Sequence, residues 1–322
     1  MAGAAGRRLR RALAALLLAL SAPAAAAEFV FASAEQGARI LAGRDGFFEA
    51  MAPPEIRLRA VRPGRATREG LRAQFAAGAL AWNGAERRAW QASLDHLAPR
   101  LGAWSALLPQ RVLLVRVRDS VEDGIPHTRA NAILLPAGTG HLRAARRDFM
   151  LAHELFHLLT RIRPARHDSL YALIGFRPCR FTLPAELRRR RITNPDAPEE
   201  RHYLDLPGAR GAYVPLQLAR PVEALPPALA ESIDFQLLRV DVAGGVCTAR
   251  RRGGGEWDLV APSALPGLAA VTGPNSDYFA HPEELMADNF ALLLTRRARA
   301  PDRALLDRLA RWLDEQAPQA TN

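Results

Sequence analysis

Lysine is absent from this chain of 322 residues, so all 44 residues of the Lys and Arg class are arginines. Aromatic residues are also scarce, at 7% of the chain. Proteins that read nucleic acid gather basic side chains into patches and interleave them with stacking aromatics. Here the arginines are scattered, apart from two short runs at residues 188–191 and 250–252. The formal net charge of +11 therefore gives no indication of a nucleic-acid partner.

Beyond residue 30, the chain lacks any apolar stretch near the roughly 20 residues that a membrane-spanning helix needs. The first 27 residues are different in kind. Four arginines between residues 7 and 11 precede a short apolar segment, and small residues then lead to Ala27. This order is typical of a secretory signal peptide. The alternative is a retained N-terminal anchor, for which the apolar segment is short.

We therefore predict cleavage near Ala27, so that residues 1–27 are removed and the mature chain begins at Glu28. A chain exported in this way is periplasmic or secreted. It is expected to have no transmembrane segment.

Cysteine occurs only twice, at Cys179 and Cys247. An exported chain meets an oxidising compartment, which favours a disulfide between the two. Two buried free thiols are the alternative. Such a bond would close a long loop and contribute about 4 kcal/mol on the chain-entropy account.

The pattern of apolar residues and chain breakers predicts an α+β protein. Residues 28–110 read as a helical N-terminal region, and residues 165–233 read as irregular apart from one short helix at 169–174. A β-meander is expected near the end of an insertion that covers residues 165–280. The individual predictions are strands at 111–118, 131–135, 235–242, 246–251 and 256–260, and helices at 143–162, 282–294 and 301–315. Pro136 follows the second of these strands, which favours an edge position for it.

The most informative motif is His153-Glu154-Leu155-Phe156-His157, an H-E-x-x-H sequence within the predicted helix 143–162. Positions i and i+4 of a helix share a face, so the two histidines can bind one Zn²⁺. Glu154 is placed to take a proton from an attacking water. The competing interpretation is two histidines packed in a core, but burial of two His and a Glu without a partner is costly.

A catalytic zinc needs a third protein ligand besides the two histidines. Glu284 is the first candidate, because it begins a predicted helix and Asp288 follows one turn later. Asp288 can then accept the N–H of a ligating histidine. Glu283 and His281 lie within three residues of Glu284 and stay open as alternative ligands, and His281 could equally cap the helix. The lone histidines His127, His167 and His202, by contrast, are expected at the surface.

These two segments resemble the gluzincins, zinc peptidases of the thermolysin kind that carry H-E-x-x-H on one helix and a Glu on a later one. The match comprises His153, Glu154 and His157, and then Glu284 with Ala287-Asp288. The second segment is also similar to that of lethal-factor-type peptidases, in which an upstream Tyr assists catalysis. This likeness makes Tyr278 a candidate catalytic group.

The resemblance implies a zincin-like catalytic domain over residues 111–322, with the active-site helix against a small sheet. An extended peptide or protein substrate would bind along an edge strand, expected at residues 131–135. The implied function is a periplasmic or secreted zinc metallopeptidase with Glu154 as general base. Two alternatives remain open: a zinc amidase acting on cell-wall peptides, and a non-catalytic envelope-binding module.

Overall fold

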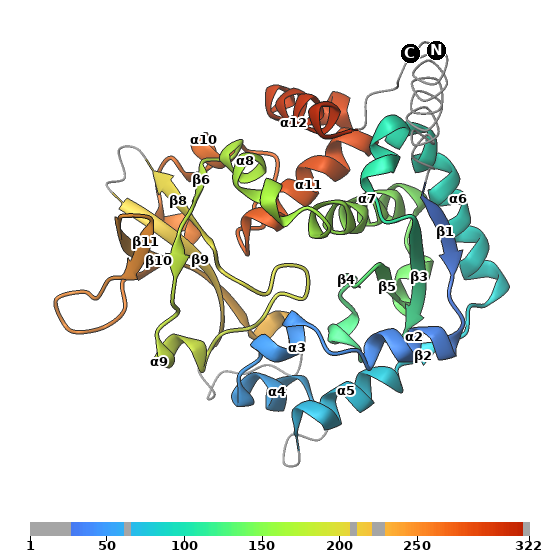
Figure 1. Ribbon diagram of the computed structural model, residues 1–322, viewed down its shortest axis with the longest axis horizontal. Helices are drawn as coiled ribbons and strands as arrows, with labels where there is room; N and C mark the ends of the chain where they lie inside the picture. The colour runs from blue at the N-terminus through green and yellow to red at the C-terminus, as the bar shows by residue number, and fades with distance from the viewer. Residues whose placement is uncertain (1–26, 61–65, 207–210, 221–228, 318–322) are drawn as a thin grey trace, which may run out of the picture.

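The computed structural model describes residues 27–60, 66–206, 211–220 and 229–317 of the chain. The predicted signal peptide thus lies, except for Ala27, outside the described residues. Two sheets lie on opposite sides of the view in Figure 1, and helices cross between them. The arrangement is an α+β architecture, which confirms the predicted class. No helix within the described ranges combines the length and the apolar character that a membrane span requires.

The first sheet is mixed and contains five strands, with β1, β3, β5 and β4 in that order and β2 paired to β3. Strands β1 and β5 run parallel to β3, whereas β2 and β4 run antiparallel to their partners. The strands are β1 (Glu28–Phe31), β2 (Ala79–Leu80), β3 (Arg111–Val117), β4 (His127–Arg129) and β5 (Ala132–Pro136).

This topology corrects two predictions. The region 28–110 is mostly helical, as expected, but it is not separate from the rest, because β1 and β2 both join the sheet of β3 across the proposed boundary. The strand at 131–135 is not an edge strand either. It lies between β3 and β4 as β5, and all five of its residues are buried. The edge belongs to β4, a three-residue strand that follows a turn at Glu122–Gly124.

The second sheet contains seven strands and fills much of the region expected to be irregular. Its order is β6, β8, β9, β10, β11, β7, with β12 also paired to β10. The predicted meander is confirmed only in part, because β12 pairs with β10 and not with β11. The strands are β6 (Phe176–Pro178), β7 (Arg180–Phe181), β8 (His202–Leu206), β9 (Gly211–Ala219), β10 (Ile233–Ala243), β11 (Val246–Ala249) and β12 (Leu259–Val260).

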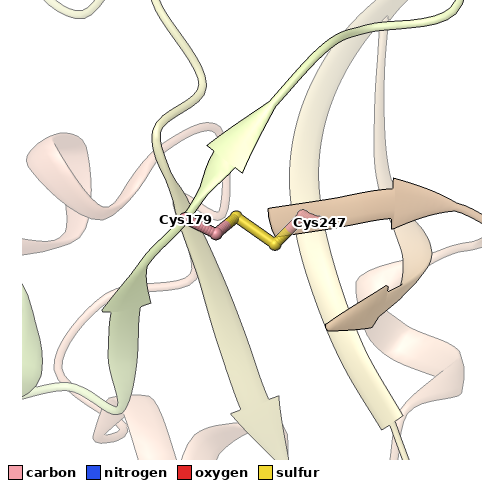
Figure 2. The surroundings of a disulfide bond; sticks show 2 residues. All are labelled: Cys179 and Cys247. Atoms are coloured by element: carbon pink, nitrogen blue, oxygen red, sulfur yellow. A yellow bond between two sulfur atoms is a disulfide. The ribbon is translucent and has the colours of Figure 1, made fainter. Parts of the chain in front are cut away.

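A disulfide joins Cys179, between β6 and β7, to Cys247 on β11, as Figure 2 shows. The two Cα atoms are 5.8 Å apart, and the bond closes a separation of 68 residues. It lies in a small buried cluster with apolar side chains of β9 and β10. The predicted pairing is therefore confirmed. The bond links the residue between β6 and β7 to β11, near the end of the sheet where β11 and β7 pair.

The helices agree best with the sequence where they are longest. The predicted helix 143–162 is α7, and the predicted helix 282–294 is α11. The last helix begins after the N-cap Asp302 and not at Pro301. The helices are α2 (Ala34–Leu41), α3 (Gly46–Ala50), α4 (Pro53–Arg59), α5 (Arg68–Ala76), α6 (Gly84–Leu101), α7 (Ala144–Arg161), α8 (His167–Ala172), α9 (Ala185–Arg188), α10 (Leu268–Thr272), α11 (Pro282–Thr295) and α12 (Arg303–Gln316).

Helices α7 and α11 pack against each other in the middle of the molecule, between the two sheets (Figure 1). Apolar side chains of α7, such as Leu151, Leu155 and Leu158, are fully buried with Phe290 of α11 in the largest core cluster. Burial of each such side chain contributes about 1.5–3 kcal/mol. This packing holds the two helices rigidly, and both carry the polar residues that the sequence singled out.

Candidate metal centre

Helix α7 presents His153 and His157 on one face, as their spacing of four residues requires. The two imidazole rings are 4.8 Å apart and nearly perpendicular. His157 is almost completely buried. The helical spacing therefore brings both rings together on one face of α7.

Helix α11 brings the acidic residues to the same place. His281 is its N-cap, and the Nδ1 atom of His281 accepts the backbone N–H of Glu283 at 3.1 Å. Pro282 occupies the first turn, where its fixed φ suits a helix start. Glu283 and Glu284 follow in that turn and are both buried. His281 thus caps the helix, and it belongs to neither of the metal-binding groups found among the described residues.

The three predicted ligands converge. The Oε2 atom of Glu284 lies 3.0 Å from Nε2 of His153 and 3.6 Å from Nε2 of His157. Ligand atoms about 2.0–2.1 Å from a tetrahedral zinc are separated by about 3.3 Å, so the observed spacings bracket that value. These three residues form a group that could hold a metal ion.

The other ring nitrogen of each histidine is occupied by a carboxylate. Nδ1 of His153 donates to Oδ1 of Asp288 at 2.9 Å, as predicted. Nδ1 of His157 donates to Oε1 of Glu283 at 3.0 Å. Such partners fix the ring orientation and direct Nε2 toward a metal. Glu283 therefore orients a histidine, and Glu284 is the carboxylate that faces both Nε2 atoms.

Glu283 also accepts two hydroxyl hydrogen bonds inside the core. Oγ of Thr160 donates to its Oε1 at 2.5 Å, and the hydroxyl of Tyr171 donates to its Oε2 at 2.6 Å. Its carboxylate therefore has three donors in all, and the side chain is almost completely buried. Sequence reasoning missed Thr160 and Tyr171, because nothing local marks either residue as a partner of α11.

The loop between α9 and β8 contributes two further residues that the sequence did not single out. Nδ2 of Asn194 donates to Oε1 of Glu284 at 2.6 Å. One carboxylate oxygen of Asp196 lies within 4.8 Å of ligand atoms of both Glu154 and His157. The turn-rich Asn-Pro-Asp sequence predicts a rigid loop here, but only the tertiary structure places it against the centre.

Charges in the centre are strongly coupled. Burial opposes protonation of His153, but hydrogen bonds to Asp288 and Glu284 outweigh burial and raise its pKa to about 10. Burial likewise favours neutral Glu284, yet the charge of His157 and the hydrogen bond from His153 hold the pKa of Glu284 well below its usual range. The negative charge of Glu284 is thus balanced by protons on the two histidines. One divalent cation bound between the same three residues can balance that charge instead.

Glu154 forms a second group that could hold a metal ion, with His157 and Asp196, and its electrostatic environment also suits a base. Burial raises its pKa to about 8, and the nearby Asp196 carboxylate adds to that rise. Its Oε2 atom is buried without a hydrogen-bond partner among the described residues. Buried polar atoms in proteins are rarely left unpaired, because each costs free energy. This atom is therefore available to a water or a substrate group that enters the centre.

The donor set fits zinc. Two imidazole nitrogens and one carboxylate oxygen are a common ligand set of catalytic zinc, which keeps a further position open. Carboxylates behind both histidines complete the arrangement. Together with the spacing of the three ligand atoms and the unpaired oxygen of Glu154, these features are what the sequence-based hypothesis of a metal site requires.

Tyr278 lies near the same group of carboxylates. Its pKa is raised well above the usual range by burial and then by the charges of Glu284 and Asp196. The ring of Phe235 on β10 packs edge-on against it, with centroids 5.8 Å apart. Tyr278, in the segment that leads into α11, thus packs against the second sheet.

The lone histidines were expected at the surface, and this is wrong for two of them. His127 is completely buried in β4, and His202 is buried in β8, where its Nε2 donates to Asp168 at 2.7 Å. His167 is only partly buried, and its Nε2 lies 3.2 Å from the carbonyl of Thr160. None of the three belongs to the metal-binding groups found in the described part of the chain.

Comparison with family models, with curated proteins and with solved structures gave no match for this chain.

Proposed function

We propose that this protein is a zinc-dependent metallopeptidase that acts outside the cytoplasm. The observation that carries the proposal is the position of one Glu284 oxygen, 3.0 and 3.6 Å from the Nε2 atoms of His153 and His157. Beside it, Glu154 has a buried oxygen that no described group satisfies. A site that only stored a metal would have no need of such a carboxylate.

In this proposal, His153, His157 and Glu284 hold the ion, while Asp288 and Glu283 fix the two imidazole rings. When bound, zinc supplies Lewis-acid chemistry, polarising the carbonyl and lowering the pKa of water. Glu154 accepts a proton from the attacking water and delivers it to the amide nitrogen as the C–N bond breaks. In the same proposal, Tyr278 donates a hydrogen bond to the carbonyl oxygen as negative charge develops on it; its nearness to the carboxylates of the centre supports this role.

The disulfide supports export, because such bonds persist in oxidising compartments. It is compatible with the predicted signal peptide and with cleavage near Ala27. We accordingly place the mature enzyme, from Glu28, in the periplasm or outside the cell, with peptides or proteins as substrates.

The test is cleavage of a peptide library by purified residues 28–322, beside the Glu154→Gln variant. We expect the wild-type protein to cleave peptide bonds in a zinc-dependent way and Glu154→Gln to lose nearly all turnover while it keeps its metal. The glutamine has the shape of the glutamate but cannot take the proton. Wild-type turnover by Glu154→Gln would refute the role of Glu154, and no cleavage by either protein would count against a peptidase.

A further inference from the structure

The edge of β4 that faces away from β5 is buried, and side chains of this chain occupy it. Among the strands of the described ranges, β4 pairs with β5 alone, and Thr128 stands opposite Ile133 in that ladder. The backbone N–H of Thr128 donates to Oδ1 of Asp196 at 2.9 Å. Its carbonyl accepts Nη2 of Arg161 at 3.3 Å. Both backbone groups of Thr128 are therefore satisfied from outside the sheet.

Arg161 and Asp196 also bind each other, and they bond to two further groups at this edge, the carbonyl of Ala130 and the hydroxyl of Thr128. Nη2 of Arg161 lies 3.1 Å from Oδ1 of Asp196. Nη1 of the same arginine donates to the carbonyl of Ala130 at 3.2 Å. The hydroxyl of Thr128 donates to Asp196 as well. We call this pair, Arg161 and Asp196, the latch.

The latch reaches from the strand edge into the catalytic centre. One Asp196 oxygen lies within 4.8 Å of ligand atoms of Glu154 and His157. The Asp196 side chain is only 5% exposed, so it is held in the interior and does not project into solvent. A peptide that adds to β4 beside the metal would need this same volume and the same backbone N–H.

We propose that Asp196 acts as a built-in substrate mimic: its carboxylate occupies the place of a substrate carbonyl on Thr128, and an extended peptide must displace it to bind. This inference rests on the proposed function. It adds that the resting site is closed by the chain itself, and that the peptide competes with the latch for one backbone edge.

The contacts suit displacement of a side chain and not movement of the whole loop. Just before Asp196, Thr193 is fixed by its backbone N–H and hydroxyl to Glu55, and its carbonyl accepts Arg59. These partners are deeply buried. The bonds of Asp196 to β4, by contrast, are made by its carboxylate alone, so rotation of one side chain frees Thr128 while the loop stays in place.

The experiment measures peptide binding to the metal-free protein, so that it does not depend on turnover. A fluorescein-labelled mixture of random hexapeptides is titrated with residues 28–322, and the anisotropy gives Kd. Asp196→Ala should bind the mixture about tenfold more tightly than wild type, which corresponds to release of about one hydrogen bond to a charged group. Glu199→Ala is the matched control, because Glu199 lies three residues further along with an exposed side chain; its Kd should equal that of wild type.

Unchanged peptide affinity in Asp196→Ala would overturn the latch, and so would equal tightening in Glu199→Ala. If Asp196→Ala does not fold, Asp196→Asn decides: it keeps an oxygen for Thr128 but loses the charge that holds Arg161. We expect a smaller gain in affinity there, and no gain overturns the proposal. If the protein cleaves peptides in a zinc-dependent way but Asp196→Ala leaves the peptide affinity unchanged, only the latch is refuted. If Asp196→Ala binds peptides more tightly but neither the wild type nor any variant cleaves them, only the proposed peptidase activity is refuted.

Discussion

Replacement of Glu283 tests whether its carboxylate orients His157 or is itself a ligand of the metal. Its carboxylate accepts three buried donors, from His157, Thr160 and Tyr171, at 3.0, 2.5 and 2.6 Å. Glu283→Ala leaves all three without an acceptor. Breaking one side of a buried charged network costs about 3–5 kcal/mol, a large share of the stability of about 5–15 kcal/mol of a typical protein. Loss of the partner of a ligating histidine lowers metal affinity about 10- to 100-fold.

Urea unfolding of the metal-free protein measures the first effect, and competition with a zinc chelator measures the second. Tyr171→Phe is the milder variant, since it removes one donor and leaves the other two. We expect it to lose about 1.5–3 kcal/mol, the value of one hydrogen bond to a charged group, with little change in zinc affinity. Stability and zinc affinity both unchanged in Glu283→Ala would refute the role of Glu283. A complete loss of zinc, as large as that in Glu284→Ala, would show that Glu283 is itself a ligand.

Three further predictions concern other parts of the molecule. Tyr278→Phe should reduce peptide turnover at least tenfold, about one hydrogen bond to developing charge, with zinc content unchanged; equal turnover would remove Tyr278 from the mechanism. Reduction of Cys179–Cys247 should lower the free energy of unfolding by about 4 kcal/mol in urea with and without reductant, and the unreduced, denatured protein should show no free thiol. Burial lowers the pKa of His127, so below about pH 6.5 the unfolded state binds a proton that the folded state refuses. Stability should therefore be complete above that pH and fall as the pH decreases toward the folded pKa, and His127→Phe should flatten this part of the pH profile of urea unfolding.

The parts of the fold predicted from sequence are those with a strong local signal. Helix α7 is long, apolar and ended before Pro164, and α11 begins at Pro282, so both could be predicted nearly to their ends. The i and i+4 spacing then placed His153 with His157 and Glu284 with Asp288, because a helix determines which residues share a face.

Strand β9 of the second sheet escaped prediction because its buried residues do not alternate with exposed ones. Strand β9 has six consecutive buried residues, so no period of two appears in its sequence. Pro215 lies within it, which argues against a central strand. The structure tolerates this proline because β8 pairs with β9 over Gly211–Tyr213 and does not reach Pro215.

In the first sheet, β4 also escaped prediction, because it has only three residues, and all three are polar although they are buried.

The missed residues of the site depend on tertiary contacts. Asn194 and Asp196 reach the centre from a loop about 40 residues after the H-E-x-x-H motif, and no local pattern indicates where that loop docks. Glu283 was ambiguous for a related reason. Its role depends on which ring nitrogen of His157 it faces, and the partners Thr160 and Tyr171 that determine this come from α7 and α8.

Zinc stoichiometry is the most direct test of the proposed centre. Residues 28–322, purified with zinc present and then dialysed free of excess metal, are measured by elemental analysis beside the Glu284→Ala and Glu199→Ala variants. We predict one zinc per chain in the wild type and in Glu199→Ala, and a sharp loss in Glu284→Ala, because Glu284 places a carboxylate oxygen 3.0 and 3.6 Å from the Nε2 atoms of His153 and His157. A wild-type protein without zinc, or a Glu284→Ala protein that retains a full equivalent, would contradict the proposed centre.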